Sequence, residues 1–165
     1  MIVRLRSIPQ EGMDLSFVIP PDQVRNGFPE DDETREYFAQ EVSCQVHLDL
    51  NRKDVFLTGN AGTSMHPVCA RCGEAYESTL SVELELTCSP AAKVPHGADV
   101  IQESDEGVIF YRKDALDLSE IVREQLLLSL PIRYLCDPDC KGLCLHCGAN
   151  LNEGQHDCKK HAPVN

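Results

Sequence analysis

Two pairs of cysteines in this chain have the spacing of a zinc knuckle. They are Cys69-Ala-Arg-Cys72 and Cys144-Leu-His-Cys147, and a glycine follows each of them. Two intervening residues let a tight turn bring both sulfur atoms to one ion, and the glycine supplies the positive φ that a bulkier residue resists. Four further candidate ligands lie downstream, so the chain offers eight, enough for two tetrahedral sites: Cys136, Cys140, His156 and Cys158.

The spacing along the chain predicts how these ligands pair. Cys144 and Cys147 should join His156 and Cys158, because the loop between the two pairs is short and its closure costs little entropy. Cys69 and Cys72 should then take Cys136 and Cys140 from more than sixty residues away, which would staple the fold. We expect one or two zinc ions, with iron as an alternative in a four-thiolate site. Neither site leaves a position for water, which favours a structural role over catalysis.

A redox dithiol is the main alternative for a C-x-x-C pair. A thioredoxin-like pair lies at a helix N-terminus. Here Cys69 follows an extended segment and Gly73 leads into a strand, which favours metal binding. The sequence shows no Ser-His-Asp set, phosphate loop or paired carboxylates, so we predict that the protein is not an enzyme. Cys44 and Cys88 lie on the apolar sides of alternating segments and should be buried.

The charge of the chain is acidic and uneven. Its 165 residues carry 15 Lys and Arg against 27 Asp and Glu, a formal charge of −12. Residues 131–165 hold four basic and four acidic residues together with five of the nine cysteines, so the whole excess of acid lies upstream. We therefore expect an acidic β-rich domain at residues 1–131 and a cysteine-rich zinc tail at 132–165. A generic nucleic-acid binder has a basic surface, and this chain would need a local patch instead.

Compartment follows from what the sequence does not contain. No window reaches the roughly 18–20 consecutive apolar residues of a membrane span. Arg4 and Arg6 interrupt the first apolar residues, so we expect no secretory signal. The expected compartment is the cytoplasm, where disulfides are rare and clustered cysteines indicate metal or redox chemistry. We expect no membrane and no small-molecule substrate as partner.

Alternation and capping predict the elements that must position these ligands. Residues 42–50 and 80–88 alternate apolar and polar side chains as half-buried strands do, with an acidic outer face on the second. Residues 51–54 suit a hairpin turn, Gly59 and Gly62 a bulge or bend, and 108–111 a short edge strand. Residues 22–39 are expected to be a polar loop or helix start, and 89–107 a mobile linker.

One main helix is predicted at about residues 117–130. Asp117 and Glu120 fit a variant capping box, apolar residues follow with helical spacing, and Pro131 ends the helix. The predicted fold class is therefore α+β: an antiparallel sheet with one main helix and a cysteine-rich zinc-binding tail.

Several motifs together resemble the YceD-like family. They are the run from Leu116 to Pro131, Leu135-Cys136, Cys140-Lys-Gly-Leu-Cys144, Cys147-Gly, Asn150-Leu-Asn152 and the upstream Cys69-x-Arg-Cys72. The resemblance covers roughly residues 40–160 and implies a role in accumulation of large-subunit (23S) ribosomal RNA in the bacterial cytoplasm. Many relatives have a cysteine where this chain has His156.

The resemblance and the charge together predict the kind of partner. We expect a non-enzymatic ribosome biogenesis factor whose acidic body attracts a basic ribosomal protein or assembly factor. Contact with rRNA is then indirect or weak. Two alternatives remain open: a direct RNA-binding zinc protein that uses Arg133, Lys141, Lys159 and Lys160, and a thiol redox or metal-responsive regulator.

Overall fold

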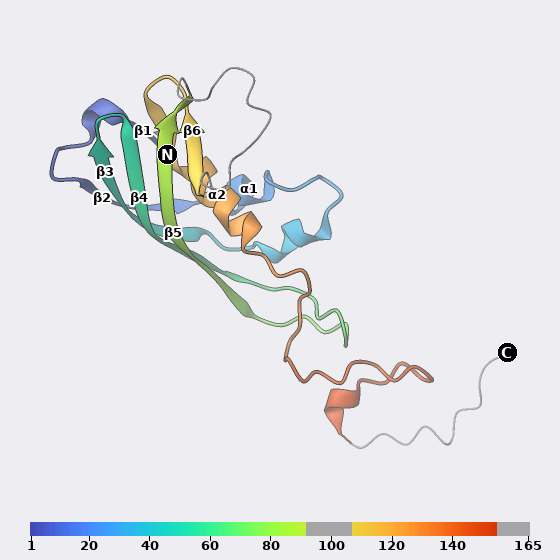
Figure 1. Cartoon of the computed structure of the whole chain (residues 1–165). Helices are drawn as coiled ribbons and strands as arrows, with labels where there is room; N and C mark the ends of the chain where they lie inside the picture. The colour runs from blue at the N-terminus through green and yellow to red at the C-terminus, as the bar shows by residue number, and fades with distance from the viewer. Residues whose placement is uncertain (92–106, 155–165) are drawn as a thin grey trace, which may run out of the picture.

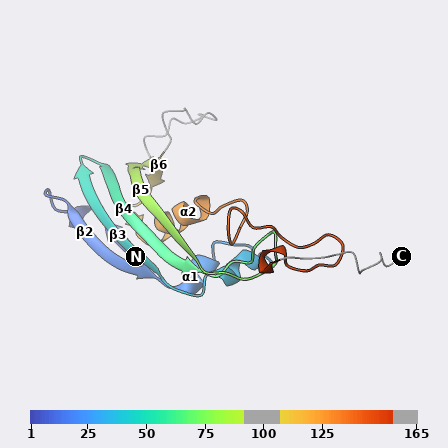
Figure 2. The same cartoon turned by 90° about the horizontal axis from the view of Figure 1, so that it is seen from below.

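The fold is built on one curved sheet of five strands. A computed structural model of the chain describes residues 1–91 and 107–154. The strands lie in the order β2-β3-β4-β5-β6 (Figures 1 and 2). Their bounds are β2 (Met13–Ile19), β3 (Val42–Asn51), β4 (Asp54–Met65), β5 (Ser78–Pro90) and β6 (Val108–Tyr111). The alternation predicted for residues 42–50 and 80–88 is confirmed, because Val46, Leu48, Leu84 and Leu86 are buried while Glu83 and Glu85 are exposed.

The sheet is mixed, which corrects the prediction of an antiparallel sheet. Its first four strands pair antiparallel, but β6 pairs parallel with β5, Thr87 opposite Val108. A parallel neighbour requires the chain to return to the starting end of the previous strand, which takes a dozen or more residues. The predicted linker at residues 89–107 begins too early, because Ser89 and Pro90 still belong to β5. Its residues 92–106 lie outside the described part of the chain.

A second, two-stranded sheet pairs the N-terminus with the segment before the main helix. β1 (Ile2–Arg4) runs antiparallel to β7 (Ala115–Asp117), with Val3 opposite Leu116. The short 3-10 helix η1 (Leu5–Ser7) follows β1, and the Leu5 amide donates to the carbonyl of Asp114 at 3.0 Å. These contacts bring the first residues of the chain against the turn between β6 and β7.

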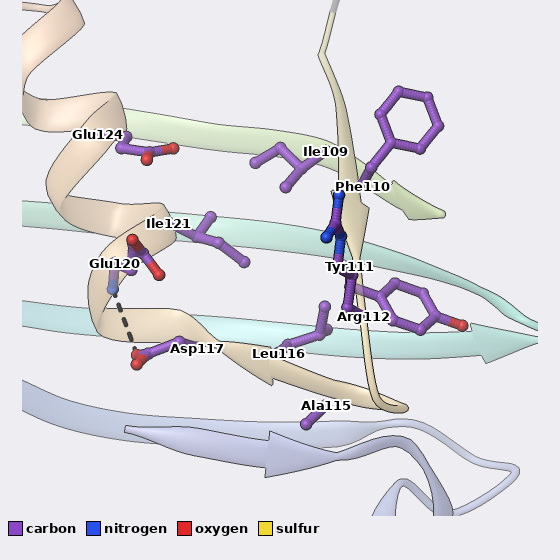
Figure 3. A pocket seen from close by; sticks show the side chains of 10 residues that line it. All are labelled: Ile109, Phe110, Tyr111, Arg112, Ala115, Leu116, Asp117, Glu120, Ile121 and Glu124. Atoms are coloured by element: carbon purple, nitrogen blue, oxygen red, sulfur yellow. Dashed lines mark hydrogen bonds between the residues drawn. The ribbon is translucent and has the colours of Figure 1, made fainter. Parts of the chain in front are cut away.

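The predicted helix is confirmed as α2 (Leu118–Leu128). The Asp117 carboxylate accepts from the amide of Ser119 at 3.1 Å and from that of Glu120 at 3.4 Å, and Figure 3 shows the second of these bonds. The helix ends two residues before the expected position, with Ser129 as its C-cap. Its apolar face is buried against the sheet, and Leu118, Val122 and Leu126 have no exposed surface. No helix in the described residues is long and apolar enough to cross a membrane.

The segment before β3 is more structured than its polar composition indicated. It holds α1 (Pro21–Arg25) and the 3-10 helix η2 (Glu33–Tyr37), which begins at the side-chain cap made by Asp32. Val24 and Phe38 on this segment are completely buried in the core. The sequence predicted a polar loop or helix start here, because the few apolar residues of the segment follow neither a helical nor a strand period.

Gly59 lies in the middle of β4 without forming the bulge that the sequence allowed. The ladder is continuous there, with Val46 on one side and Leu84 on the other. A Cβ on Gly59, whose φ is +150°, would overlap the carbonyl oxygen of Gln45 and lie 2.8 Å from the Cα of Val46. Glycine is therefore required by the close approach of β3, not by an extra residue.

Candidate metal centre

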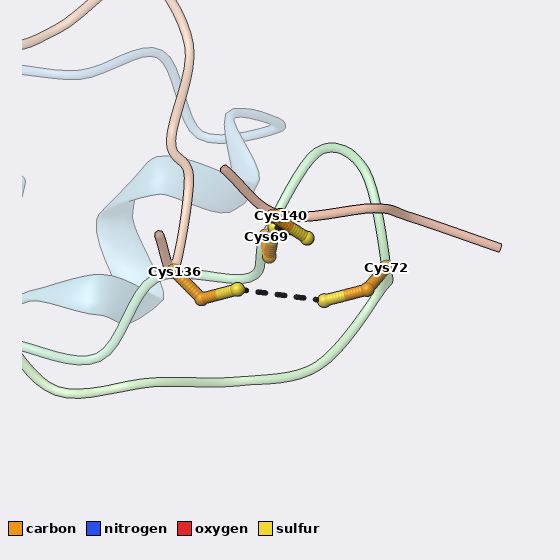
Figure 4. A group of neighbouring side chains, drawn as sticks. All are labelled: Cys69, Cys72, Cys136 and Cys140. Carbon is orange, nitrogen blue, oxygen red and sulfur yellow. Dashed lines mark hydrogen bonds between the residues drawn. The ribbon is translucent and has the colours of Figure 1, made fainter. Parts of the chain in front are cut away.

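Four cysteines from two distant segments meet at one end of the molecule. The loop between β4 and β5 carries Cys69 and Cys72, and the segment after α2 brings Cys136 and Cys140 (Figure 4). All four sulfur atoms lie within 4.8 Å of one another. The Sγ atoms of Cys69 and Cys140 are 3.8 Å apart, and those of Cys72 and Cys136 are 3.7 Å apart. The long-range grouping of ligands expected from the sequence is thus the one that the fold brings together.

These distances fit a tetrahedral metal ion. Zinc–sulfur bonds of about 2.3 Å in tetrahedral geometry place the sulfur atoms about 3.8 Å from one another. A four-thiolate set suits zinc or iron. Because all four positions of a tetrahedron are filled by cysteine, the arrangement is closed to water, as in structural sites. The cluster could therefore hold a metal ion.

Backbone amides of both segments direct their hydrogens at the sulfur of Cys69. The hydrogen bond from the Cys136 amide has the largest effect and lowers the pKa of Cys69. Burial raises this pKa, but the amides of Cys72 and Arg71 lower it further, to about 6. Lost solvation, followed by the neighbouring thiols of Cys69 and Cys140, raises the pKa of Cys136 to about 12. Ionisation of one of these four thiols opposes that of its neighbours, and a coordinating cation would supply the charge that favours all four thiolates.

Arg71 lies inside the first knuckle and binds the backbone of the segment that carries Cys136 and Cys140. Its Nη1 donates to the carbonyl oxygens of Pro138 and Cys140, both at 2.9 Å. The amide of Ala70 donates to the carbonyl of Tyr134 at 2.8 Å. These bonds join residues more than sixty positions apart beside the sulfur atoms. The sequence predicted the ligands but not this role for Arg71.

Asn152 connects the tail to the same cluster. Its Nδ2 donates to the Sγ of Cys140 at 3.2 Å, and its Oδ1 accepts from the amide of Lys141 at 2.8 Å. Burial raises the pKa of Cys140, but the hydrogen bonds from Asn152 and from the amide of Gly142 outweigh it and leave the pKa lowered. The only sequence signal for this residue was its place in the Asn150-Leu-Asn152 motif.

We expect Asn152→Ala to weaken metal binding at the four-cysteine cluster about 10–100-fold, the usual effect of losing a residue that orients a metal ligand. The measurement is competition for zinc against a chromophoric chelator. Glu153→Gln is the matched control, since it changes an exposed neighbour of the same short helix η5 (Leu151–Glu153). Equal zinc affinities for the wild type and Asn152→Ala would contradict this role.

The tail knuckle repeats the backbone of the first one. The amide of Cys69 donates to the carbonyl of Glu74 at 2.9 Å, and the amide of Cys144 donates to that of Ala149 at 2.8 Å. The bridge between Val68 and Ala75 recurs between Leu143 and Asn150, and Gly73 and Gly148 have φ of 76° and 72°. Cys144 and Cys147 are therefore shaped as the first pair is. Their predicted co-ligands His156 and Cys158 lie outside the described residues, so the second site stays a prediction.

The knuckle geometry does not match a thioredoxin-like redox site. Such a pair lies at the N-terminus of a helix. Cys69 and Cys72 instead lie in a turn between two strands, and within residues 1–91 and 107–154 no helix begins at either knuckle.

Fold and cluster together define a class: an α+β protein whose mixed sheet is tied to a cysteine-rich C-terminal segment through a four-thiolate cluster. Residues 57–165 match the family described as large ribosomal RNA subunit accumulation protein YceD, and the chain belongs to that family. The resemblance noted in the sequence is thereby confirmed.

Relatives carry the same description in plants. The chain is 30% identical over 139 residues to "Large ribosomal RNA subunit accumulation protein YCED homolog 1, chloroplastic" of Arabidopsis thaliana, covering 71% of this chain and 43% of that protein. Its counterpart in Zea mays is 29% identical, with coverage of 67% and 46%. An uncharacterized protein of Mycobacterium leprae is 24% identical, with coverage of 67% and 51%. The chain thus spans about half the length of these curated relatives. No solved structure gives a significant match.

Proposed function

We propose that this protein is a non-enzymatic ribosome biogenesis factor that supports accumulation of large-subunit rRNA in the bacterial cytoplasm. The observation that carries the proposal is membership of the YceD family, with relatives named for that role. The closed four-cysteine cluster is consistent with it, because a site without a position for water or substrate serves structure. Zinc bound there would cross-link the β4–β5 loop to the segment after α2.

Removal of the gene tests this function. Cells that lack the protein should contain less large-subunit rRNA relative to small-subunit rRNA, and the wild-type gene should restore the ratio. Quantifying both rRNAs from total RNA gives the answer. An unchanged ratio in the deletion strain would contradict the proposed function.

The open face of the sheet supports a basic protein as the partner. The helices lie on one side of the sheet (Figure 2), and the other side exposes a row of polar residues. Four acids lie on this face, which we call the acidic face: Asp14, Asp49, Glu83 and Glu85. Its basic group is His47, whose pKa is raised chiefly by the hydrogen bond with Asp14 at 2.7 Å. Lysine and arginine are absent from the face among the described residues, so a basic ribosomal protein or assembly factor is the complementary ligand.

We expect charge reversal at Glu83 and Glu85 to slow association with such a partner about tenfold while changing dissociation less, because exposed charges act mainly on encounter. Stopped-flow or surface-based kinetics against purified basic large-subunit proteins provide the measurement, and added salt should weaken the wild-type contact.

Reversal of Glu74 and Glu77 is the matched control, because both are exposed acids on the β4–β5 loop away from the acidic face. Equal slowing by this control would show that net charge acts, rather than the acidic face.

A further inference from the structure

The fold gathers five cations around one open hollow on this acidic protein. The hollow has a volume of about 640 Å³ and lies between the N-terminal segment, the β3–β4 turn and the β6–β7 turn, at the end of the sheet that is uppermost in Figure 1. Its cations are Arg4, Arg6, Arg52, Lys53 and Lys113. We call this set the basic cleft. It draws a third of the 15 basic residues of the chain into one place.

The basic cleft has a charge opposite to that of the chain. Its five cations and the single acid Asp114 give it a formal charge of +4, so the remaining residues of the −12 chain carry −16. The neighbouring hollow between α2 and β6, of about 400 Å³, carries Asp117, Glu120 and Glu124 against Arg112 (Figure 3). Positive charge is therefore local to the cleft and is not a general property of this end of the molecule.

The cations of the basic cleft are not used by the fold. All five are exposed, and within residues 1–91 and 107–154 none of them forms an ion pair. Other arginines are engaged: Arg25 donates to the carbonyl of Phe38, Arg71 to those of Pro138 and Cys140, and Arg123 pairs with Glu120. The five cations of the cleft are therefore available to bind a ligand from outside the chain.

The backbone of the basic cleft is held in place and strained. Three described residues other than glycine have a left-handed backbone, and all three line the cleft: Arg52, Lys113 and Asp114, with φ of 58°, 58° and 50°. Each such residue costs about 1 kcal/mol or more. The Tyr111 hydroxyl donates to the carbonyl of Lys53 at 2.6 Å, which joins the two turns. The fold therefore places charged residues at backbone positions where glycine or asparagine would be easier to accommodate.

We propose that the basic cleft binds the phosphate backbone of RNA. Three of its five cations are arginines, whose planar guanidinium matches phosphate oxygens with two parallel hydrogen bonds. An open hollow of this size admits several phosphates of one strand. The choice of RNA over another polyanion rests on the proposed function. The sequence predicted that contact with rRNA is indirect or weak, and left direct binding through the tail cations open as an alternative; the folded chain offers a different and denser set of cations.

Fluorescence anisotropy with an RNA hairpin of about 20 nucleotides tests the proposal at low salt. The variant combines Arg52→Gln, Lys53→Gln and Lys113→Gln in the full chain. We expect it to bind at least about tenfold more weakly, and the slope of log K against log salt to fall by about 2–3, because about 0.7–0.9 counterions are released for each phosphate contact. Circular dichroism and the zinc content should match those of the wild type.

The matched control is Arg133→Gln with Lys141→Gln, which neutralises exposed cations outside the cleft. It should bind the hairpin as the wild type does. Loss with this control and not with the cleft variant would overturn the proposal in favour of the tail. Failure of the wild type to bind the hairpin would overturn it as well, and so would equal binding of poly-glutamate, which would indicate an acidic protein. The rRNA ratio in the deletion strain reports on the proposed function separately.

Discussion

Cys72→Ser should weaken metal binding at the four-cysteine cluster and loosen two distant parts of the chain at once. A structural zinc site contributes about 10–16 kcal/mol, so one thiolate of four accounts for about 3 kcal/mol, or about 100-fold in affinity. Because Cys72 faces Cys136 from 64 residues away, both the β4–β5 loop and the segment after α2 should lose protection. Native mass spectrometry counts the ions, and hydrogen exchange locates the loosened segments.

Cys147→Ser is the control for this experiment. It changes the second knuckle and should loosen only residues after about 140. The wild type should carry at least one zinc ion, and two if His156 and Cys158 complete the second site. Equal effects of both substitutions confined to the tail would contradict the long-range site. A wild-type protein purified without chelator that carries paired disulfides and no metal would contradict both sites.

Gly59→Ala should destabilise the sheet by about 3–5 kcal/mol. Two costs add up: alanine would have to adopt a positive φ, and its Cβ would clash with the backbone of the neighbouring strand. The Cβ would overlap the carbonyl oxygen of Gln45, and neither β3 nor β5 can move without breaking its ladder. Against a typical total of about 5–15 kcal/mol, this loss would leave a large unfolded fraction. Urea unfolding followed by circular dichroism measures it.

Gly62→Ala provides the comparison within the same strand. Its Cβ would lie 3.3 Å from the carbonyl oxygen of Leu80, and its φ lies outside the left-handed range. We expect a change of less than about 1 kcal/mol. Equal losses for the two alanines would show that glycine is required along β4 for a reason other than the approach of β3.

The sequence correctly predicted the elements that depend on neighbouring residues, through helix capping and the alternation of apolar and polar side chains. Asp117 caps α2 as its sequence indicated, and the alternation around Val46 and Leu84 gave the correct buried faces. The direction of β6 was not predictable, because four apolar residues read alike in parallel and antiparallel pairs. Three-residue β7 is too short for any period. Buried Phe38 belongs to no apolar period of the sequence and owes its place to tertiary packing.

The same distinction between local sequence signals and tertiary contacts applies to the candidate sites. Ligand type and spacing pointed to Cys69 and Cys136 because metal chemistry limits which residues can serve. Arg71 and Asn152 act through hydrogen bonds that exist only once distant segments meet. The basic cleft was invisible for a similar reason: Arg4, Arg52 and Lys113 are far apart in the chain, and only the pairing of β1 with β7 and the β3–β4 turn bring them together.

The separation between the two halves of the four-cysteine cluster also sets an order of events during translation. Cys72 leaves the ribosome 64 residues before Cys136, an interval of about 3–13 s at about 5–20 residues per second. The strands β2 to β5 and the helix α2 are all synthesised before Cys136, so the hydrophobic core can assemble first. Throughout that interval the nascent chain holds two of the four thiolates and retains an ion weakly. Metal capture at this cluster would therefore be a late step. If the ion is zinc, newly made chains in zinc-starved cells would accumulate with a formed sheet and a C-terminal segment that no ion ties to it.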